Sequence, residues 1–302
     1  MMMTREAEAV KYSRRILISR HAAIGDVLLT TPIIREVRRR YPDATIDFET
    51  MVPIALENHP CVTKIVPVET DRSEYDLVID LNLAYEMLPK DHIINSYSLK
   101  AFGEIIRDRG VDLNWSIADS RVVDTILQQL DAVFARPVIV HPARSWENRT
   151  MSQAFWRGVC CRLTAIGLRV IIVGSESDID VGRIERLHDF RSKLTIPQIA
   201  NLISKASCFI GSDSSLLHVA GTTQTPIVGI YTCAKAEYRM PFRRSLLGYR
   251  TEAIKPTINC YGCLHDEPVP ATFCRCRRGD FVCLLQIDVD AVVDAAIRQL
   301  VT

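Results

Sequence analysis

The stretch 211–221, Gly-Ser-Asp-Ser-Ser-Leu-Leu-His-Val-Ala-Gly, combines a carboxylate and an imidazole with a serine-rich turn. It follows an apolar run that predicts a buried strand, and it leads into a helix that Ser214 or Ser215 can cap. Backbone N–H groups and the positive end of the helix dipole at such a turn favour phosphate. Asp213 and His218 flank the turn as groups that can hydrogen-bond or titrate. The alternative interpretation is a serine-capped helix with a histidine packed in the core.

A second carboxylate stands at the turn in 23–32, Ala-Ile-Gly-Asp-Val-Leu-Leu-Thr-Thr-Pro. Gly25 permits a close backbone approach at this predicted strand-to-helix turn. Asp26 lies where the helix dipole favours the ionised carboxylate, and it faces the cleft that is predicted at the ends of the strands. An ordinary N-cap aspartate is the alternative interpretation.

Two further polar turns follow predicted strands in the second half of the chain. The stretch 141–149 offers Arg144 and Arg149 as anion contacts, and two guanidinium groups suit a diphosphate. In 174–178, Gly-Ser-Glu-Ser-Asp, Glu176 can accept hydrogen bonds from ribose hydroxyls. The alternatives are a solvated polar loop for the first turn and an ordinary helix start for the second.

The ten cysteines are unevenly distributed, and five of them fall between residues 260 and 283. Thiolates in such a cluster can form a four-ligand structural zinc or iron site in a loop with little core of its own. The alternative is a loop of free thiols. The candidate ligands are Cys260, Cys263, Cys274, Cys276 and Cys283.

The elements that position these residues alternate between strand and helix. This alternation predicts two Rossmann-like, doubly wound parallel sheets that face a central cleft. Ala135 precedes Arg136 and Pro137, where a helix ends and a new alternation starts, so we place two domains at 1–135 and 136–302. The predicted strands are 15–20, 45–48, 62–68, 75–80, 137–142, 168–174, 206–210 and 225–231. The predicted helices are 27–40, 121–134, 152–166, 178–188, 196–205 and a terminal helix after residue 283.

The bulk composition narrows the classes of function. The sequence has 37 basic and 36 acidic residues, and this net charge of +1 argues against broad electrostatic binding of nucleic acid. No apolar segment approaches the roughly 20 residues that span a bilayer. The start lacks the apolar core of a signal peptide, so we expect a cytoplasmic protein with reduced cysteines.

Two of these motifs together resemble glycosyltransferase family 9, the heptosyltransferase group of lipopolysaccharide synthesis. They are Gly-Asp-Val-Leu-Leu-Thr-Thr-Pro-Ile-Ile-Arg at 25–35 and Gly-Ser-Asp-Ser-Ser-Leu-Leu-His-Val-Ala at 211–220. The resemblance extends from residue 15 to about residue 292 and includes the C-terminal cysteine pattern. It implies a GT-B fold and inverting transfer from an ADP-heptose-like donor without a catalytic metal or other cofactor. It also suggests an enzyme at the inner face of the membrane, with a glycolipid or protein acceptor.

The resemblance assigns roles to individual residues. Asp26 matches the catalytic carboxylate, the general base for the acceptor hydroxyl. Arg149 stands where the family has a basic residue near the phosphates, and Glu176 matches an acidic ribose contact. Ser215 stands where the family tends to have glycine. The segment that holds the donor diphosphate corresponds to Asp213, Ser214, Ser215, Leu216 and His218.

Three rival functions remain open from the sequence. A GT-B protein can bind a nucleotide sugar without transferring it, although Asp26 argues for transfer. The cysteine loop can be a metal-stabilised module that docks a protein or a nucleic acid. A Rossmann oxidoreductase is disfavoured because no Gly-x-Gly-x-x-Gly follows the first strand.

Overall fold

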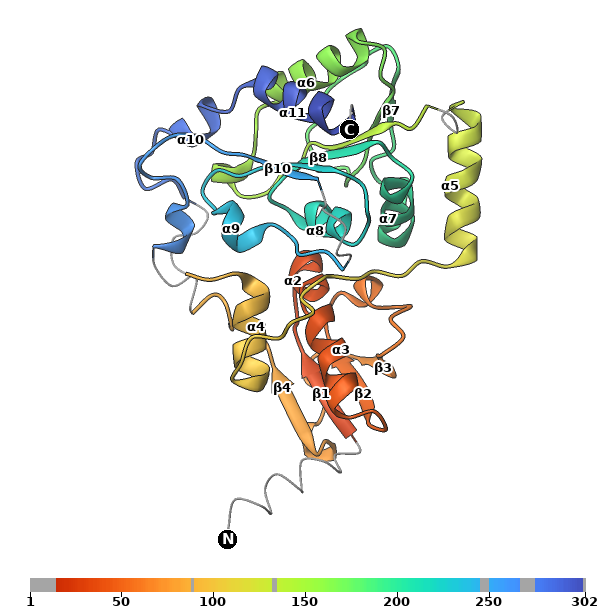
Figure 1. Cartoon of the computed structure of the whole chain (residues 1–302), viewed down its shortest axis with the longest axis vertical. Coiled ribbons are helices and arrows are strands. Elements are labelled where there is room, and N and C mark those ends of the chain that lie inside the picture. Colours follow the sequence, from red (N-terminus) through yellow and green to blue (C-terminus); the bar gives the residue numbers. More distant parts are fainter. Residues whose placement is uncertain (1–14, 88–89, 132–134, 245–249, 267–274, 301–302) are drawn as a thin grey trace.

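The computed structural model describes residues 15–87, 90–131, 135–244, 250–266 and 275–300. Two parallel sheets form two bodies stacked along the long axis of the molecule (Figure 1). Helix α2 (Ile24–Leu28) of the first body packs against α8 (Ser215–Gly221) of the second. The predicted α/β fold class, two facing Rossmann-like domains, is confirmed.

The first sheet has the strand order β3-β2-β1-β4, and its strands are parallel. Because β1 lies between β2 and β4, the chain changes direction across the sheet at the β1/β4 boundary, and ligands in open α/β sheets collect at such a boundary. The strands are β1 (Arg15–Ser19), β2 (Thr45–Glu49), β3 (Lys64–Val66) and β4 (Leu77–Asp80).

The second sheet has the order β10-β9-β8-β5-β6-β7 and is also parallel. Its change of direction lies between β5 and β8, beside the turn at 211–221. The strands are β5 (Val138–His141), β6 (Val170–Ile172), β7 (Leu187–Asp189), β8 (Cys208–Ser212), β9 (Ile227–Ile230) and β10 (Thr251–Ile254).

Both faces of the second sheet are covered, which explains why central strands such as β5, β6 and β9 are largely apolar runs. On β5, Val138 and Val140 pack in the cluster formed with α6 (Gln153–Ala165) and α11 (Val289–Leu300), whereas Ile139 faces α7 (Ile196–Ser204) and α8. The cluster under α7 and α8 continues into the first body, so the two bodies share apolar packing.

The remaining helices are short or lie at the flanks. Helix α4 (Ile93–Phe102) covers the first sheet beside α3 (Thr31–Arg40), and α5 (Ile117–Gln129) lies along α7 (Figure 1). The others are α9 (Ala236–Arg239), α10 (Val282–Leu285) and the 3₁₀ turns Pro53–Ala55, Arg72–Glu74, Glu147–Arg149 and Cys263–His265. The domain boundary at residue 135 stays a prediction; α5 precedes it in sequence but packs on the second body.

The single helix predicted over 27–40 is wrong in one respect, because the structure forms two helices, α2 and α3. The hydroxyls of Thr30 and Thr31 donate to the carbonyls of Val27 and Leu28, and these local bonds compete with the helical ladder. Pro32 then lies in the first turn of α3, where its missing N–H costs nothing. The break orients α2 independently of α3.

The helix predicted over 178–188 is wrong. Gly182 has φ +72°, and Ile179 and Val181 are both buried two residues apart, as in an extended chain. The segment ends in the edge strand β7, which pairs with β6. Of the predicted helix 121–134, α5 accounts for the first part, and residues 132–134 lie outside the described residues.

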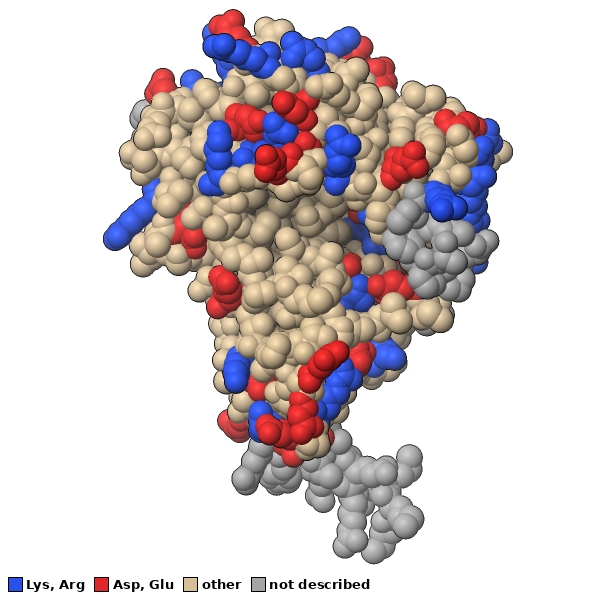
Figure 2. Space-filling view, turned by 180° about the vertical axis from the view of Figure 1, so that it is seen from behind, with Lys and Arg blue, Asp and Glu red and all other residues tan. Residues whose placement is uncertain are grey.

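The surface agrees with the near-neutral composition. Basic and acidic side chains are interspersed over the face that Figure 2 displays. No helix in the described ranges is long and apolar enough to cross a bilayer.

Candidate active site

A cavity of about 580 Å³ lies where the two changes of strand order face each other. The first body contributes Asp26, which follows β1, and Tyr85, which follows β4. The second contributes Arg149, which follows β5, and Asp213, which follows β8. The cavity therefore lies where the chain topology of two facing parallel sheets predicts a ligand site.

Asp26 lies in the first turn of α2 and is held by three hydrogen bonds. Its Oδ2 accepts from Arg20 Nη2 at 2.9 Å and from the Ala23 N–H at 3.2 Å, and its Oδ1 accepts from the Tyr85 hydroxyl at 3.1 Å. The side chain is 18% exposed. Burial and the negative charge of Asp26 raise the pKa of Tyr85, so this phenol stays a hydrogen-bond donor at neutral pH. Asp26 is thus an oriented carboxylate with limited access to the cavity.

Arg20 is a buried partner of Asp26 that the sequence analysis did not identify. Its guanidinium group also binds Glu86 at 2.7 Å and lies 5.2 Å from the centre of the Tyr85 ring. Burial would lower the pKa of Arg20, but Tyr97, Asp26 and Glu86 outweigh it and raise that pKa. Arg20 could have been identified from its position directly after a predicted buried strand, because residues at the carboxyl ends of such strands reach the cleft.

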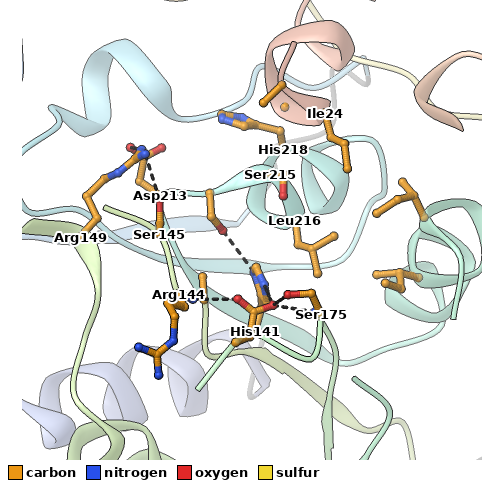
Figure 3. Close-up of a pocket in the computed structure, with 18 of the residues that line it drawn as sticks. Ile24, His141, Arg144, Ser145, Arg149, Ser175, Asp213, Ser215, Leu216 and His218 are labelled. Carbon is orange, nitrogen blue, oxygen red and sulfur yellow. Dashed lines mark hydrogen bonds and ion pairs between the residues drawn. The ribbon is translucent and has the colours of Figure 1, made fainter. Parts of the chain in front are cut away.

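On the donor side, Asp213 and Arg149 form a buried ion pair, with Arg149 Nη1 2.8 Å from Asp213 Oδ2. Arg149 also stacks on the Trp146 ring at 3.8 Å from its centre (cation–π). Burial would raise the pKa of Asp213, but Arg149, Arg239 and His218 lower it. The carboxylate is therefore ionised, and it holds the arginine at the wall of the cavity (Figure 3).

Helix α8 begins at the predicted serines, with Ser214 in an extended conformation as the N-cap and Ser215 as the first helical residue. The predicted capping hydrogen bond does not form, because the Ser214 hydroxyl donates to the carbonyl of Ser212. Ser215 therefore needs no glycine, since its backbone is in the ordinary helical region. The first N–H groups of a helix have no intrahelical partner, and both serines and the buried Leu216 line the cavity.

His218 and Gly25 form a close contact between the two bodies. A Cβ atom added to Gly25 would lie 2.7 Å from His218 Cδ2, so only glycine allows this approach. His218 is 5% exposed, and its Nδ1 has no hydrogen-bond partner among the described residues. Burial lowers the pKa of His218 despite the nearby Asp213 and Asp26, which favours a neutral imidazole in the cavity wall.

Two predicted contacts have different outcomes. Arg144 lines the cavity, although its Nε donates to the carbonyl of Ser177 at 2.8 Å and its side chain is exposed. Glu176 is exposed and does not line the cavity, so the structure does not bring it to the other predicted residues.

Arg239 is a second cation that the sequence analysis missed. It comes from the short helix α9, is 5% exposed and lines the same cavity. Its guanidinium carbon lies 4.7 Å from the centre of the Tyr85 ring in the other body. The apolar and polar residues around Arg239 follow neither a helical nor a strand period, so no sequence pattern pointed to this residue.

Four of the five candidate metal ligands line a second cavity, of about 320 Å³, together with Cys233. Burial would raise the pKa of Cys276, but hydrogen bonds from backbone N–H groups, with that of Phe281 the strongest, outweigh burial and lower this pKa. Burial raises the pKa of Cys283 to about 11. No three side chains in the described ranges are arranged as ligands of a metal ion. Cys274 lies outside the described residues. The four candidate ligands that line this second cavity are Cys260, Cys263, Cys276 and Cys283.

A sequence model of glycosyltransferase family 9 (heptosyltransferase) matches residues 110–267, which include the donor-side turn. The chain belongs to glycosyltransferase family 9. It is a glycosyltransferase with the two-domain fold of that family.

Individual relatives are distant in sequence. Lipopolysaccharide heptosyltransferase 3 of Escherichia coli is 21% identical over 291 residues, and the match covers 74% of this chain and 85% of that protein. The solved glycosyl transferase family 9 protein of Veillonella parvula is 13% identical with a TM-score of 0.74, over 95% of this chain and 97% of the other.

A third similar protein is TibC, a bacterial iron-containing dodecameric glycosyltransferase from enterotoxigenic Escherichia coli. It is 19% identical with a TM-score of 0.73, over 96% of this chain and 76% of the other. TibC has also been solved in complex with ADP-D-beta-D-heptose. At these identities, the two solved structures bear on the fold of this chain only.

Proposed function

We propose that the protein transfers a heptose or related sugar, with inversion, from an ADP-heptose-like donor to an acceptor hydroxyl. The observation that supports this most directly is that Asp26 and the donor-side turn line one cavity from opposite bodies. The relatives named for heptosyl transfer, and the ADP-D-beta-D-heptose bound by TibC, support the choice of donor.

In the proposed reaction Asp26 is the general base. Its carboxylate takes the proton of the acceptor hydroxyl while the acceptor oxygen bonds to the anomeric carbon of the sugar. The bond from that carbon to the diphosphate breaks, and its electron pair stays on the phosphate oxygen. A positioned base contributes about 10²–10⁴-fold.

The donor side would stabilise the charge that builds up on the departing diphosphate. Arg149 and Arg239 supply positive charge in a partly buried site, where it is worth more than in water. The N–H groups of Ser214, Ser215 and Leu216 at the start of α8 supply hydrogen bonds, as does the Nδ1 of His218, which has no partner in the part of the chain that the structure describes. Glu176 as a ribose contact requires its loop to move toward the cavity.

The acceptor would approach along the first body. The carboxyl ends of β2 and β4 are followed by three exposed apolar side chains, Met51, Leu83 and Met87. A glycolipid of the lipopolysaccharide pathway, as the name of the E. coli relative suggests, fits this apolar rim, and a protein acceptor is the alternative.

Asp26→Asn tests the assignment of the base. The amide cannot take a proton, so kcat should fall about 10²–10⁴-fold, while the dissociation constant for ADP, measured by calorimetry, should change little. Asp43→Asn, on the exposed turn before β2, is the matched control. Undiminished turnover of ADP-heptose by Asp26→Asn would remove Asp26 from the mechanism. A wild-type protein that neither ADP nor another nucleoside diphosphate stabilises would remove the donor site as well.

We also propose that Cys260, Cys263, Cys276 and Cys283 hold a structural zinc or iron ion. Thiolates suit both ions, the four side chains line one cavity, and the N–H groups around Cys276 already favour its thiolate. Binding would require the thiols to turn toward a common centre. The name of TibC, iron-containing, is consistent with this proposal.

Elemental analysis of the purified protein tests the metal site. We expect about one zinc or iron per chain, and loss of that metal with a lower melting temperature in Cys260→Ser and Cys263→Ser. The partly buried Cys61→Ser, in the first body, is the control. Metal-free wild-type protein, purified without chelators, would contradict the proposal.

A further inference from the structure

Beneath the donor side of the cavity, three side chains from different loops form a hydrogen-bonded chain (Figure 3). Asp178 Oδ2 lies 3.2 Å from His141 Nε2, and His141 Nδ1 lies 3.2 Å from Ser214 Oγ. The side chains of His141 and Asp178 are 5% and 7% exposed. The imidazole is turned the opposite way from that of a Ser-His-Asp hydrolase, in which Nε2 faces the serine.

The carboxylate of Asp178 also binds the backbone of its own loop and of the loop that follows His141. Its Oδ1 accepts from the Arg144 N–H at 2.7 Å, and its Oδ2 accepts from the Ser175 N–H at 2.7 Å. Burial opposes ionisation, but His141 and these N–H donors lower the pKa of Asp178 to about 2. The carboxylate is therefore ionised at neutral pH and acts only as an acceptor, so His141 Nε2 carries the proton that it shares with Asp178.

The backbone at Gly174 is adapted to this carboxylate. Gly174 has φ +138°, and a Cβ atom there would lie 2.4 Å from Asp178 Oδ2 and 3.0 Å from His141 Cδ2. The N–H of Ile179 also donates to the carbonyl of Pro142 at 2.9 Å, which joins the same two loops beside Asp178. A glycine, a backbone bond and a buried carboxylate thus fix one arrangement.

The connected loops follow three neighbouring strands, β8, β5 and β6, at their carboxyl ends. Each presents polar groups to the cavity, through Ser214, Arg144 and Ser175 respectively. His218, whose buried Nδ1 is unpartnered among the described residues, lines the cavity beside them. Loops that move independently would have to be ordered each time a ligand binds, and prior ordering lowers that entropic cost.

We propose that His141 and Asp178 are positioning residues that hold these three loops as one rigid cradle for the diphosphate of the donor. The inference rests on the proposed donor site, but it concerns two residues to which neither the sequence analysis nor the proposed mechanism assigns a role. Neither residue is expected to touch the sugar or the acceptor. Their loss should therefore weaken phosphate binding and leave the transfer step nearly unchanged.

Four variants test the cradle. His141→Gln can still donate to Asp178 but does not reach Ser214, and His141→Asn reaches Ser214 but not Asp178. Asp178→Asn keeps the shape of the side chain and removes its charge. Ser214→Ala removes the last hydroxyl in the chain. The matched controls are His188→Gln, on the edge strand β7, and the exposed Asp180→Asn, two residues from Asp178.

The measurements are calorimetric dissociation constants for ADP, adenosine and inorganic pyrophosphate, together with the melting temperature and the KM and kcat for ADP-heptose. We expect the three substitutions at His141 and Asp178 to raise the dissociation constants for ADP and pyrophosphate about tenfold or more. Adenosine binding and kcat should change less than threefold. A purely structural role would lower the melting temperature without changing the ratio of ADP to adenosine affinity.

The outcomes separate this inference from the proposed function. Unchanged ADP-to-adenosine ratios in Asp178→Asn and both His141 variants would overturn the cradle while leaving the transferase intact. Weakened pyrophosphate binding in a protein that transfers no sugar would support the cradle and overturn the proposed reaction. A wild-type protein that binds neither ADP nor pyrophosphate would overturn both.

Discussion

Gly25 brings Asp26 to the donor side because its missing side chain lets α2 lie close to His218 and Ser215 of α8. A methyl group at this position would meet His218 Cδ2 at 2.7 Å and the Ser215 Cα at 3.4 Å. The first distance is shorter than carbon atoms tolerate, and the ring of His218 is buried, so it has little room to turn. Asp26 is the next residue in the chain and must move with α2.

We therefore expect Gly25→Ala to lower kcat/KM about 10²-fold, the loss that a displacement of about 1 Å at a reacting group can cause. Alanine would otherwise favour the helix by about 1 kcal/mol, so the protein should remain folded. Steady-state kinetics, with circular dichroism as the check on folding, give the answer. The control is a double-mutant cycle with His218→Ala, in which Gly25→Ala should cost much less because the clashing ring is gone. An equal loss in both backgrounds would locate the effect elsewhere.

At the same scale, the sequence predicted most of the site. Gly25, Asp26, Arg144, Arg149 and the donor-side residues line one cavity because they directly follow strands of two parallel sheets. Glu176 follows β6 but is exposed, since Asp178, two residues later, is the side chain that turns inward to His141. The spacing alone did not reveal which of two neighbouring acids is buried.

At the scale of elements, the central strands β1, β5, β6, β8 and β9 were predictable because each is a short apolar run that is largely buried. The edge strands β7 and β10 are only partly buried, and the sequence did not predict them as strands. The helix predicted over 178–188 was wrong although the spacing of the apolar residues fits a helix. Gly182 at positive φ and the long-range hydrogen bond from the Ile179 N–H to the Pro142 carbonyl hold this segment in an extended form. The break between α2 and α3 depended on the hydroxyls of Thr30 and Thr31, which are as compatible with a helix interior as with its end. Local pattern therefore predicted where elements occur better than where they end.

At the scale of the whole molecule, Arg239 links the two bodies electrostatically. It belongs to the second body, lies over the Tyr85 ring of the first at 4.7 Å, and is buried. Burial would lower the pKa of Arg239, but Tyr85, Asp213 and Asp26 raise it, so the charge is retained. Its Nε has no hydrogen-bond partner among the described residues, which leaves a donor for a ligand between the bodies. No local pattern in the sequence indicates this link, because it depends on how two domains that are distant in sequence meet.

We expect Arg239→Met to weaken ADP binding about 10- to 100-fold, because a hydrogen bond from a charged group contributes about 1.5–3 kcal/mol. The kcat for sugar transfer should also fall, since the same cation faces Asp26 and the departing diphosphate. Arg239→Lys keeps the charge without the planar geometry of arginine, so its ADP affinity and kcat should lie between those of the wild type and of Arg239→Met. Because Asp213 retains Arg149, the fold should survive both changes, and thermal denaturation checks this.

Arg298→Met, on the exposed face of α11, is the matched control. Wild-type affinity and turnover in Arg239→Met would mean that the two bodies are coupled through apolar packing alone, and that the diphosphate depends on Arg149 and the start of α8.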